Sequence, residues 1–345
     1  MVPPRISVAL ATYNGAKHLR AQLDSIAAQT LPPAEIVVGD DGSTDATFDI
    51  LDEFSRTVPF PVRVQRNPTN LGYSDNFLAI ASRCEAPFLA FCDQDDHWEP
   101  AKLERCGAAF ADPEVMLVVH GGTVVDADLN PTGETLAPDL GTRATFKHLV
   151  LQPQWTIHGM RMVIRTGLLG RLPRAPRPLS YEMRRHAVTM AHDRWTPFLA
   201  GVFGRCVLLP DRLVRYRQHG GNVCGVGAAS VENQRLSNRL QMASATGSDT
   251  YRHWSMLALD CSRFLAAAAR EHPSDATALL AASRVYASTA DAQEERARLY
   301  ESASLLARLP RFARMLVAGR YASRDRGGLG GKSLLKDALV AVRPR

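Results

Sequence analysis

Three acidic residues lie close together just after a short apolar segment. Residues 88–92 are apolar and are expected to form a buried strand. Asp93, Asp95 and Asp96 follow directly, at the end of a strand, where open α/β sheets bind ligands. Carboxylates this close repel each other unless a cation shares them, and a divalent ion completed by substrate phosphates would do so. The alternative is a polar turn whose acids cap the helix that follows.

A second strand-like segment also ends in acidic residues. Residues 35–39 run into Asp40, Asp41 and Gly42, where glycine suits a tight turn, and residues 43–45 could cap the next helix. By itself, Asp-Gly-Ser is an ordinary turn between a strand and a helix. Two acidic strand ends about fifty residues apart favour one shared ligand site.

Strands and helices are expected to alternate over the first hundred residues. Residues 6–12 and 62–66 read as further strands, and each strand is followed by a segment with the apolar spacing of a helix. Four such units favour a parallel, doubly wound sheet. No Gly-x-Gly-x-x-Gly follows the first strand, so a dinucleotide-binding fingerprint is absent.

The ordered set of these motifs resembles an inverting family 2 glycosyltransferase with a GT-A fold. The resemblance covers roughly the first 225 residues and, within the family, is most like bacterial rhamnosyltransferases of surface-polysaccharide assembly. Each motif alone is weak, but the set in this order is specific. The matching segments are residues 11–15 (Ala-Thr-Tyr-Asn-Gly), 38–45 (Val-Gly-Asp-Asp-Gly-Ser-Thr-Asp), 70–72 with Asn76, 93–96 with Trp98, Pro100, Lys102 and Leu103, 192–195 (His-Asp-Arg-Trp) and 216–220 (Tyr-Arg-Gln-His-Gly).

The resemblance implies an α/β architecture with two parts. Residues 1–228 are expected to form a GT-A glycosyltransferase domain with a Rossmann-like, mostly parallel sheet. From about residue 230 the composition shifts to Ala, Leu, Arg and Ser with helical spacing. This shift predicts a helical accessory region of three to five helices over residues 229–345, with breaks at Pro273 and Pro310.

The first motifs imply a binding site for a nucleotide sugar. Asp40 would contact the pyrimidine base, Thr12 and Tyr13 would line the base pocket, and Asp93 would face the ribose or the metal. The full expected set for the nucleotide sugar is Thr12, Tyr13, Asn14, Asp40, Asp41, Asn70, Gly72, Asn76, Asp93 and Gln94.

The resemblance also implies a divalent cation, Mn²⁺ or Mg²⁺. Asp95 is the carboxylate expected to contact it, with Asp93 in its shell and His219 completing it. A lone histidine is more often a hydrogen-bonded surface or core residue than a ligand, so both readings of His219 stay open. The cation would neutralise the charge that grows on the leaving diphosphate.

Inversion requires a general base that takes the proton of the acceptor hydroxyl. Asp193 is the candidate, because the family carries an acid pair or His-Asp at this place. The alternative is that Asp193 caps a short helix with Trp195 in the core. The residues expected beside the acceptor or the donor sugar are Asp96, Trp155, His192 and Trp195.

Two apparent motifs fail on inspection. Arg194-Trp195 resembles part of the Gln-x-x-Arg-Trp signature of processive polysaccharide synthases, but Ala191 stands at the Gln position, and no apolar run reaches the length of a bilayer span. Residues 327–333 resemble a phosphate loop that lacks its first glycine, and they read as a flexible linker. A non-processive enzyme is therefore expected.

Charge is distributed unevenly along the chain. The net charge of +6 combines −8 over residues 1–120 with +14 over the rest, and residues 308–345 alone carry +8. The basic half could hold donor phosphates, a lipid-pyrophosphate acceptor or an anionic membrane surface. No recognisable nucleic-acid-binding module accompanies the charge, so no nucleic-acid partner is expected.

Taken together, these patterns predict a metal-dependent, non-processive inverting glycosyltransferase. The subgroup resemblance alone further implies that it moves L-rhamnose from dTDP-rhamnose onto a glycan or a polyprenyl-pyrophosphate-linked glycan in surface-polysaccharide or lipopolysaccharide synthesis. The rivals are a UDP-hexose-dependent transferase of the same fold and a non-catalytic nucleotide-sugar-binding assembly protein. The six cysteines show no Cys-x-x-Cys spacing and no signal peptide is recognised, so we expect free thiols and a cytoplasmic protein, peripheral on the inner face of the plasma membrane.

Overall fold

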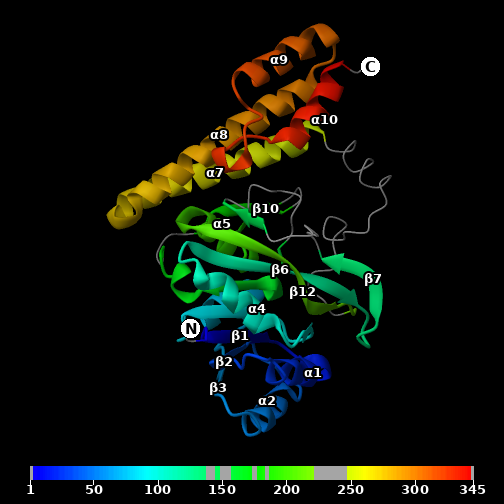
Figure 1. Ribbon diagram of the computed structural model, residues 1–345, viewed down its shortest axis with the longest axis vertical. Helices are drawn as coiled ribbons and strands as arrows, with labels where there is room; N and C mark the ends of the chain where they lie inside the picture. Colours follow the sequence, from blue (N-terminus) through cyan, green and yellow to red (C-terminus); the bar gives the residue numbers. More distant parts are fainter. Residues whose placement is uncertain are drawn as a thin grey trace. The chain divides into compact units, whose positions relative to one another are not determined.

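The computed structural model describes residues 3–136, 144–147, 157–172, 177–182, 186–220 and 247–342 (Figure 1). The chain divides into two compact units. The first takes in residues 1–150, 154–173 and 191–233, and the second takes in residues 151–153, 174–190 and 234–345. The expected boundary at residue 228 stays a prediction, and Trp155 lies outside the described residues.

A mixed sheet forms the centre of the first unit. Its strands follow the order β3-β2-β1-β4-β9-β6-β12-β5, with β7 beside β6 and β8 beside β12. The strands are β1 (Ile6–Thr12), β2 (Glu35–Asp40), β3 (Val62–Arg66), β4 (Phe88–Cys92), β5 (His97–Trp98), β6 (Val115–Val125), β7 (Pro131–Leu136), β8 (Ala144–Phe146), β9 (Met162–Arg165) and β12 (Arg205–Arg217). Strands β1 to β4 are parallel, whereas β9 runs antiparallel to both β4 and β6.

Helices cover this sheet as the alternating pattern predicts. They are α1 (Ala16–Ala27), α2 (Thr47–Ser55), α3 (Gly72–Ala81), α4 (Lys102–Ala108) and α5 (His192–Phe203), with the 3₁₀ turns η1 (Ala109–Ala111), η3 (Gly159–Arg161) and η4 (Thr166–Leu168). In α1, Leu19, Leu23 and Ile26 share one face, and all three are fully buried against the sheet core. The predicted β-α alternation is confirmed, and the sheet is parallel over β1 to β4, whereas its second half is mixed.

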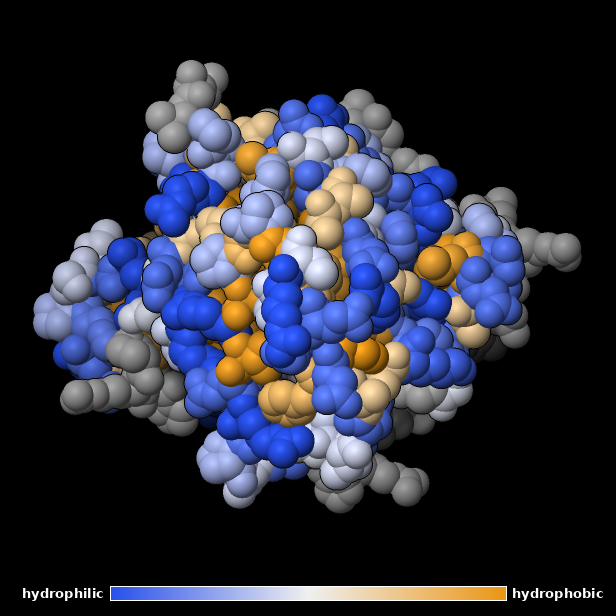
Figure 2. Space-filling view, turned by 90° about the horizontal axis from the view of Figure 1, so that it is seen from below, coloured by the Kyte–Doolittle hydropathy of each residue, from blue (hydrophilic) through white to orange (hydrophobic). Residues whose placement is uncertain are grey.

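The outer edge of this sheet is polar. Strand β3 pairs only on its β2 side within the described residues, and most of its side chains are exposed. Figure 2 looks onto the side of the first unit that carries α1, α2 and β3, where hydrophilic side chains surround small apolar spots. Charged side chains such as Arg63 on an edge strand oppose strand-to-strand association.

The second half of the sheet depends on elements that local patterns did not reveal. Strands β6 and β9 were not predicted, and the strand expected at 212–216 is the second half of the longer β12. The helix expected after the acidic segment begins at Lys102, because His97 and Trp98 first pair with β12 as the short strand β5.

The second unit is mainly helical. It contains the strand pair β10 (Leu179–Glu182) and β11 (His186–Thr189), followed by α7 (Ser248–Glu271), η5 (Pro273–Asp275), α8 (Ala276–Glu301), α9 (Leu305–Val317), η6 (Arg324–Arg326) and α10 (Gly331–Val342). The predicted helical region is confirmed, with a break at Pro273 between α7 and α8. The break expected at Pro310 is wrong, since Pro310 lies inside α9. The stretch read as a flexible linker ends in α10, and Leu329 within it is buried.

Two further features are the apolar character of the helices and the state of the cysteines. In the part of the chain that the structure describes, no helix combines the length and apolar character of a bilayer span. Cys84, Cys92, Cys106, Cys206 and Cys261 are free thiols, as expected.

Candidate active site

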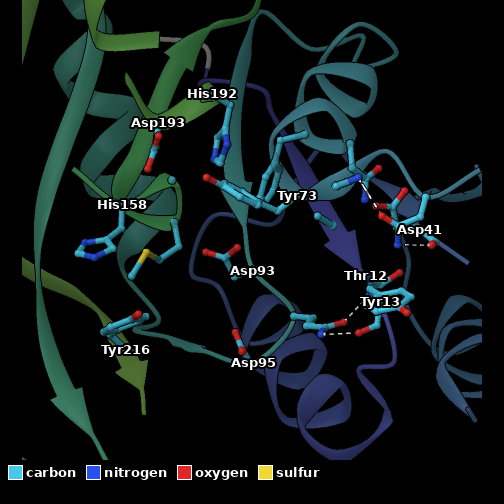
Figure 3. A pocket seen from close by; sticks show the side chains of 18 residues that line it. Thr12, Tyr13, Asp41, Tyr73, Asp93, Asp95, His158, His192, Asp193 and Tyr216 are labelled. Carbon is cyan, nitrogen blue, oxygen red and sulfur yellow. Dashed lines mark hydrogen bonds between the residues drawn. The ribbon is translucent and has the colours of Figure 1, made fainter. Parts of the chain in front are cut away.

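A pocket of about 430 Å³ opens at the carboxyl edge of the sheet in the first unit. Strands β1, β2 and β4 end side by side there, because Thr12 pairs with Asp40 and Leu10 pairs with Cys92. Eleven of the residues expected from the sequence line it: Thr12, Tyr13, Asp41, Asn70, Gly72, Asn76, Asp93, Gln94, Asp95, His192 and Asp193. Segments far apart in the chain therefore meet in one place (Figure 3).

Asp40 lies beneath the pocket rather than on its wall. It is fully buried, and its Oδ2 accepts hydrogen bonds from the backbone N–H groups of Gly42 (3.1 Å) and Ser43 (2.9 Å). Its Oδ1 accepts from the hydroxyl of Thr12 at 3.0 Å and also from that of Ser43. The carboxylate that the sequence assigned to the base thus holds the β2 turn together, and it is not among the lining residues.

Asp41 is the acid of this turn that reaches the pocket. Its Oδ1 and Oδ2 accept the backbone N–H groups of Leu71 and Gly72, both at 2.8 Å, and Oδ1 also accepts from the amide of Asn67 at 2.9 Å. Gly72 has φ of +76°, a conformation that glycine adopts without strain. Asp41 therefore fixes the start of α3 against the end of β2, and Asn70 closes the same link by donating to the Asp41 carbonyl.

The loop after β1 is held from two sides. Gln94 forms a reciprocal pair with the backbone of Tyr13: its Oε1 accepts from the Tyr13 N–H at 2.9 Å, and its amide donates to the Tyr13 carbonyl at 3.0 Å. The Asn14 N–H donates to the hydroxyl of Ser43, so Asn14 joins this loop to the β2 turn without lining the pocket. Tyr13 is 52% exposed, which leaves its ring available for stacking.

The acidic loop after β4 combines unlike environments. Burial, and then the neighbouring Asp95 carboxylate, raises the pKa of Asp93 to about 7. Asp96 is fully buried beneath the pocket. Burial, and then the carboxylates of Asp95 and Asp93, raise its pKa well above the usual range. Its Oδ1 accepts the Arg217 N–H at 3.1 Å, and its Oδ2 has no hydrogen-bond partner among the described residues.

Lys102 is the buried cation behind this loop. Its Nζ donates to the Met160 carbonyl at 2.7 Å and lies 3.4 Å from the centroid of the Trp98 ring. Burial lowers its pKa to about 8, against the opposing pull of nearby Cys92, Cys106 and the two acids Asp96 and Asp93. Lys102 thus offsets part of the negative charge from the side away from the pocket.

Asp95 and His219 come into direct contact. The Asp95 Oδ2 lies 2.9 Å from the His219 Nε2, although His219 itself is not among the residues that line the pocket. Arg217 Nε donates to the Asp95 carbonyl at 2.7 Å, which anchors the end of β12 to the acidic loop. The ring of His18 packs on that of His219 with centroids 4.6 Å apart.

These residues fit a divalent cation only in part. Within the described ranges, no three His, Cys, Asp or Glu side chains converge as a complete metal cage. Asp95 and His219 supply an oxygen and a nitrogen donor, and Asp93, whose pKa is raised by burial and by the Asp95 carboxylate, lies in the same acidic loop. An ion that takes its remaining ligands from water and diphosphate oxygens suits such a donor set.

Asp193 enters the pocket from the opposite wall. It lies in the first turn of α5, whose N-cap is Ala191, so Asp193 does not cap the helix. Its charge adds to the raised pKa of Asp93, after the larger effects of burial and of Asp95. Figure 3 shows Asp193 and His192 on one side of Asp93, with Thr12, Tyr13 and Asp41 grouped on another.

His192 and Trp195 differ in what they touch. His192 is buried among the rings of Phe77, Phe91 and Tyr73, with centroids 4.4, 5.3 and 5.9 Å away, and it lines the pocket. A Cβ on Gly159 would come within 2.5 Å of its Nε2, so η3 approaches His192 closely because residue 159 is glycine. Trp195 stacks on Phe198 in the core and is not a lining residue.

Some lining residues were not predicted. They are Ala11, Tyr73, Phe77, His158, Gly159, Met160 and Tyr216. Tyr73 and Phe77 adjoin predicted residues of α3, and Tyr216 begins a quoted motif, so proximity in sequence could have found them. Residues 158–160 carry no motif and reach the pocket only because η3 packs beside β4.

Comparisons with known proteins show what this chain is similar to. Residues 7–169 match the family model described as Glycosyl transferase family 2. An uncharacterized glycosyltransferase of Nostoc sp. is 33% identical over 36% of this chain and 38% of its own length. The putative teichuronic acid biosynthesis glycosyltransferase TuaG of Bacillus subtilis is 28% identical over 36% of this chain and 51% of its own length. The chain thus spans about half or less of the length of these relatives.

The fold also matches a solved structure. Residues 1–349 of Staphylococcus aureus TarS, crystallised in complex with UDP-GlcNAc, superpose with a TM-score of 0.55. The match is 18% identical in sequence and covers 92% of this chain and 93% of that one. It confirms the predicted GT-A-like α/β domain followed by a helical region.

Proposed function

We propose that this chain, whose residues 7–169 form a family 2 glycosyltransferase domain, transfers a sugar from a nucleoside diphosphate donor to an acceptor hydroxyl. The observation that carries the proposal is the meeting of Asp93 and Asp95 with Asp193 in one pocket. About a hundred residues separate them in the chain. A diphosphate leaving group and an attacking hydroxyl need charge control on one side and a proton acceptor on the other.

The donor nucleotide would lie along the β1 and β2 loops. The exposed ring of Tyr13 offers a stacking surface for the base, and Thr12 and Asp41 line the same part of the pocket. The side-chain amide of Gln94 bonds to both the N–H and the carbonyl of Tyr13, so this wall of the pocket is preorganised for the donor. The UDP-GlcNAc bound to the TarS relative supports a nucleoside diphosphate sugar as donor.

Asp95, His219 and Asp93 would hold a divalent cation, Mn²⁺ or Mg²⁺. Bound there, the ion would neutralise negative charge developing on the diphosphate and orient it. Asp95 is itself held in place, because its carboxylate contacts His219, two residues after β12, and its carbonyl accepts a hydrogen bond from Arg217 at the end of β12. Lys102 adds a buried positive charge behind the same loop.

Asp193 is proposed as the general base of an inverting reaction. Its carboxylate lines the pocket opposite the acidic loop, so it can accept the proton of an acceptor hydroxyl that attacks from that side. It lies in the first turn of α5, near the positive end of the helix dipole. His192, buried among aromatic rings next to it, would shape the wall that faces the acceptor.

The acceptor would be a glycan or a lipid-linked glycan in surface-polysaccharide synthesis. The TuaG relative, named for teichuronic acid biosynthesis, supports this class. For the donor, the resemblance supports dTDP-rhamnose, whereas the TarS complex supports a UDP-sugar. A binding-only assembly protein is disfavoured, because binding alone would not need Asp193 across the pocket from Asp93.

A binding and turnover panel tests the function. The purified chain is titrated calorimetrically with dTDP-rhamnose, UDP-GlcNAc, UDP-glucose and GDP-mannose, with Mn²⁺ or with EDTA, and then assayed for nucleoside diphosphate release. We expect one donor to bind selectively and to be turned over when a glycan acceptor is added. Binding of none of the four, or selective binding without any transfer or donor hydrolysis, contradicts the proposal.

The metal site is tested separately by Asp95→Ala and His219→Ala. Both variants should weaken Mn²⁺ binding in the presence of the diphosphate, by roughly tenfold or more for a lost ligand. Asp52→Ala on the exposed face of α2 is the matched control. Overlaid Mn²⁺ titrations of parent and His219→Ala would show that this histidine only positions Asp95, and full turnover in EDTA would exclude a metal role.

A further inference from the structure

Helix α9 exposes a continuous apolar face. Leu306, Leu309, Ala313, Leu316 and Val317 recur with the spacing that places side chains on one side of an α-helix, and all are exposed. Leu306 is 87% exposed and Val317 is 91% exposed, values unusual for large apolar side chains arranged in a row. The opposite side of α9 is the one that packs, through Met315 and Phe312.

Helix α10 repeats the pattern. Leu335, Leu339 and Val342 lie on one side and are 69%, 69% and 59% exposed. The opposite side faces α8, where buried Asp337 accepts a hydrogen bond from Arg296 at 2.8 Å. Both α9 and α10 pack on α8 and on each other, so both apolar faces point away from α8.

The charged side chains of α9 and α10 that reach solvent are all positive. Residues 305–342 contain eight Lys or Arg residues against two acids, Asp325 and Asp337, and Asp337 is neutralised internally by Arg296. Lys332 lies one turn before Leu335, and Arg314 lies one turn before Val317, both exposed. The cations on the two helices that reach solvent wholly or in part are Arg311, Arg314, Lys332 and Lys336.

We propose that the exposed faces of α9 and α10 dock onto an anionic lipid bilayer. Apolar side chains would enter the boundary between headgroups and acyl chains, and the flanking cations would pair with lipid phosphates. A second copy of the chain fits less well, because joining two such faces would bring two segments of net charge +6 together. The proposal goes beyond the proposed function and needs no sugar transfer for its test.

Vesicle flotation with the full chain tests the proposal. Vesicles of phosphatidylcholine alone are compared with vesicles that also contain phosphatidylglycerol, each at low and at high salt. We expect the chain to float with the anionic vesicles only, and high salt to release most of it, because the electrostatic part is screened. Equal flotation with both kinds of vesicle, or with neither, overturns the proposal.

Variants separate the two contributions. Leu306→Asn with Val317→Asn should weaken partitioning by roughly tenfold or more, since both side chains would be buried in the interface. Arg314→Gln with Lys332→Gln should weaken it by a similar factor, at about fivefold for each cation near the surface. Met256→Asn with Leu280→Asn, exposed apolar residues of α7 and α8, is the matched control and should float like the parent.

Light scattering after size exclusion excludes the competing explanation. All variants change exposed side chains, so their melting temperatures should match that of the parent. A parent chain that is dimeric without lipid, and that Leu306→Asn with Val317→Asn makes monomeric, would assign the face to a second copy and overturn the proposal. Control variants that lose flotation as strongly as the α9 pair would do the same.

Discussion

At the residue scale, neighbouring acids of the pocket are prepared for different tasks. Asp96 is fully buried and stabilises the loop by accepting a hydrogen bond from the backbone N–H of Arg217. Asp95 contacts His219 and reaches the pocket. Asp93 stands between Asp95 and Asp193, and its raised pKa reflects burial and these two neighbours. Carboxylates this close repel one another, and a cation bound between them would relieve that cost.

The role of Asp193 is the sharpest prediction at this scale. Asp193→Asn keeps the size and position of the side chain but cannot accept a proton, so turnover should fall roughly a hundredfold or more. Donor affinity should stay within a few-fold, because the donor is held by other walls of the pocket. Initial rates and calorimetric donor titrations measure the two quantities.

Asp49→Asn is the control for this substitution. Asp49 also lies in the first turn of a helix, α2, but is exposed and does not line the pocket. It should leave both rate and affinity unchanged. Loss of donor binding in Asp193→Asn with normal turnover at saturating donor would instead assign Asp193 to the binding of the donor.

At the element scale, the pocket depends on loops that tie separate strands together. Asp40 and Asp41 show how: one fixes its own turn, and the other ties that turn to the start of α3. The η3 turn adds the far wall, held by the Lys102 bond to the Met160 carbonyl and by Arg161 donating to the His120 carbonyl at 2.7 Å. A substitution that displaces η3 should therefore change the shape of the pocket.

The histidine next to this turn predicts a pH dependence of stability. Burial, and then nearby Arg161, lowers the pKa of His158 to about 4 from an ordinary 6.5. The folded chain therefore resists a proton that the unfolded chain accepts, so stability is full above pH 6.5 and is lost as pH falls toward 4. The loss from His158 amounts to about 2–3 kcal/mol.

Urea unfolding at pH 7 and pH 5 checks this assignment. The free energy of unfolding should drop less between the two pH values in His158→Gln than in the parent, because glutamine does not titrate. His272→Gln, at the partly exposed end of α7, should behave like the parent. An identical pH dependence in His158→Gln and the parent would mean that His158 does not contribute.

At the scale of the whole molecule, the chain builds two units with separate cores. The first unit gathers its core around the sheet, and the second gathers a smaller one around α8, α9 and Leu329. In the second unit, Asp337 is fully buried and accepts hydrogen bonds from Arg296, Tyr300 and Tyr321. A buried carboxylate with three donors depends strongly on its cation.

Arg296→Met should therefore destabilise the second unit by about 3–5 kcal/mol, because it leaves Asp337 without its positive partner. Hydrogen exchange should accelerate in α8 and α10, while nucleotide affinity at the pocket of the first unit stays within a few-fold of the parent. Arg298→Met removes an exposed ion pair with Glu294 from the same helix and should cost under about 1 kcal/mol. Equal effects of both substitutions would contradict a buried ion pair.

Local sequence determined most of the elements and the identity of the chemical groups. Apolar spacing over a few residues marks β1, β2, β4 and α1, since each element buries its side chains in a period set by its own backbone. The acids at the strand ends were predicted because the ends of parallel strands meet at one edge of a sheet. Asp193 was predicted because the motifs occur in an order known from the family. The helical second half followed from composition.

Only the tertiary structure decided which groups meet. Asp40 and Asp41 are adjacent and identical in type, yet Asp40 is buried within the turn after β2 and Asp41 lines the pocket. The contact between His219 and Asp95, which only the family resemblance implied, joins the segment after β12 to a loop more than a hundred residues earlier, and residues 158–160 reach the pocket only through η3. Likewise, the side of α9 that is covered depends on its contacts with α8. Such pairings are set by the packing of distant segments, and no local pattern encodes them.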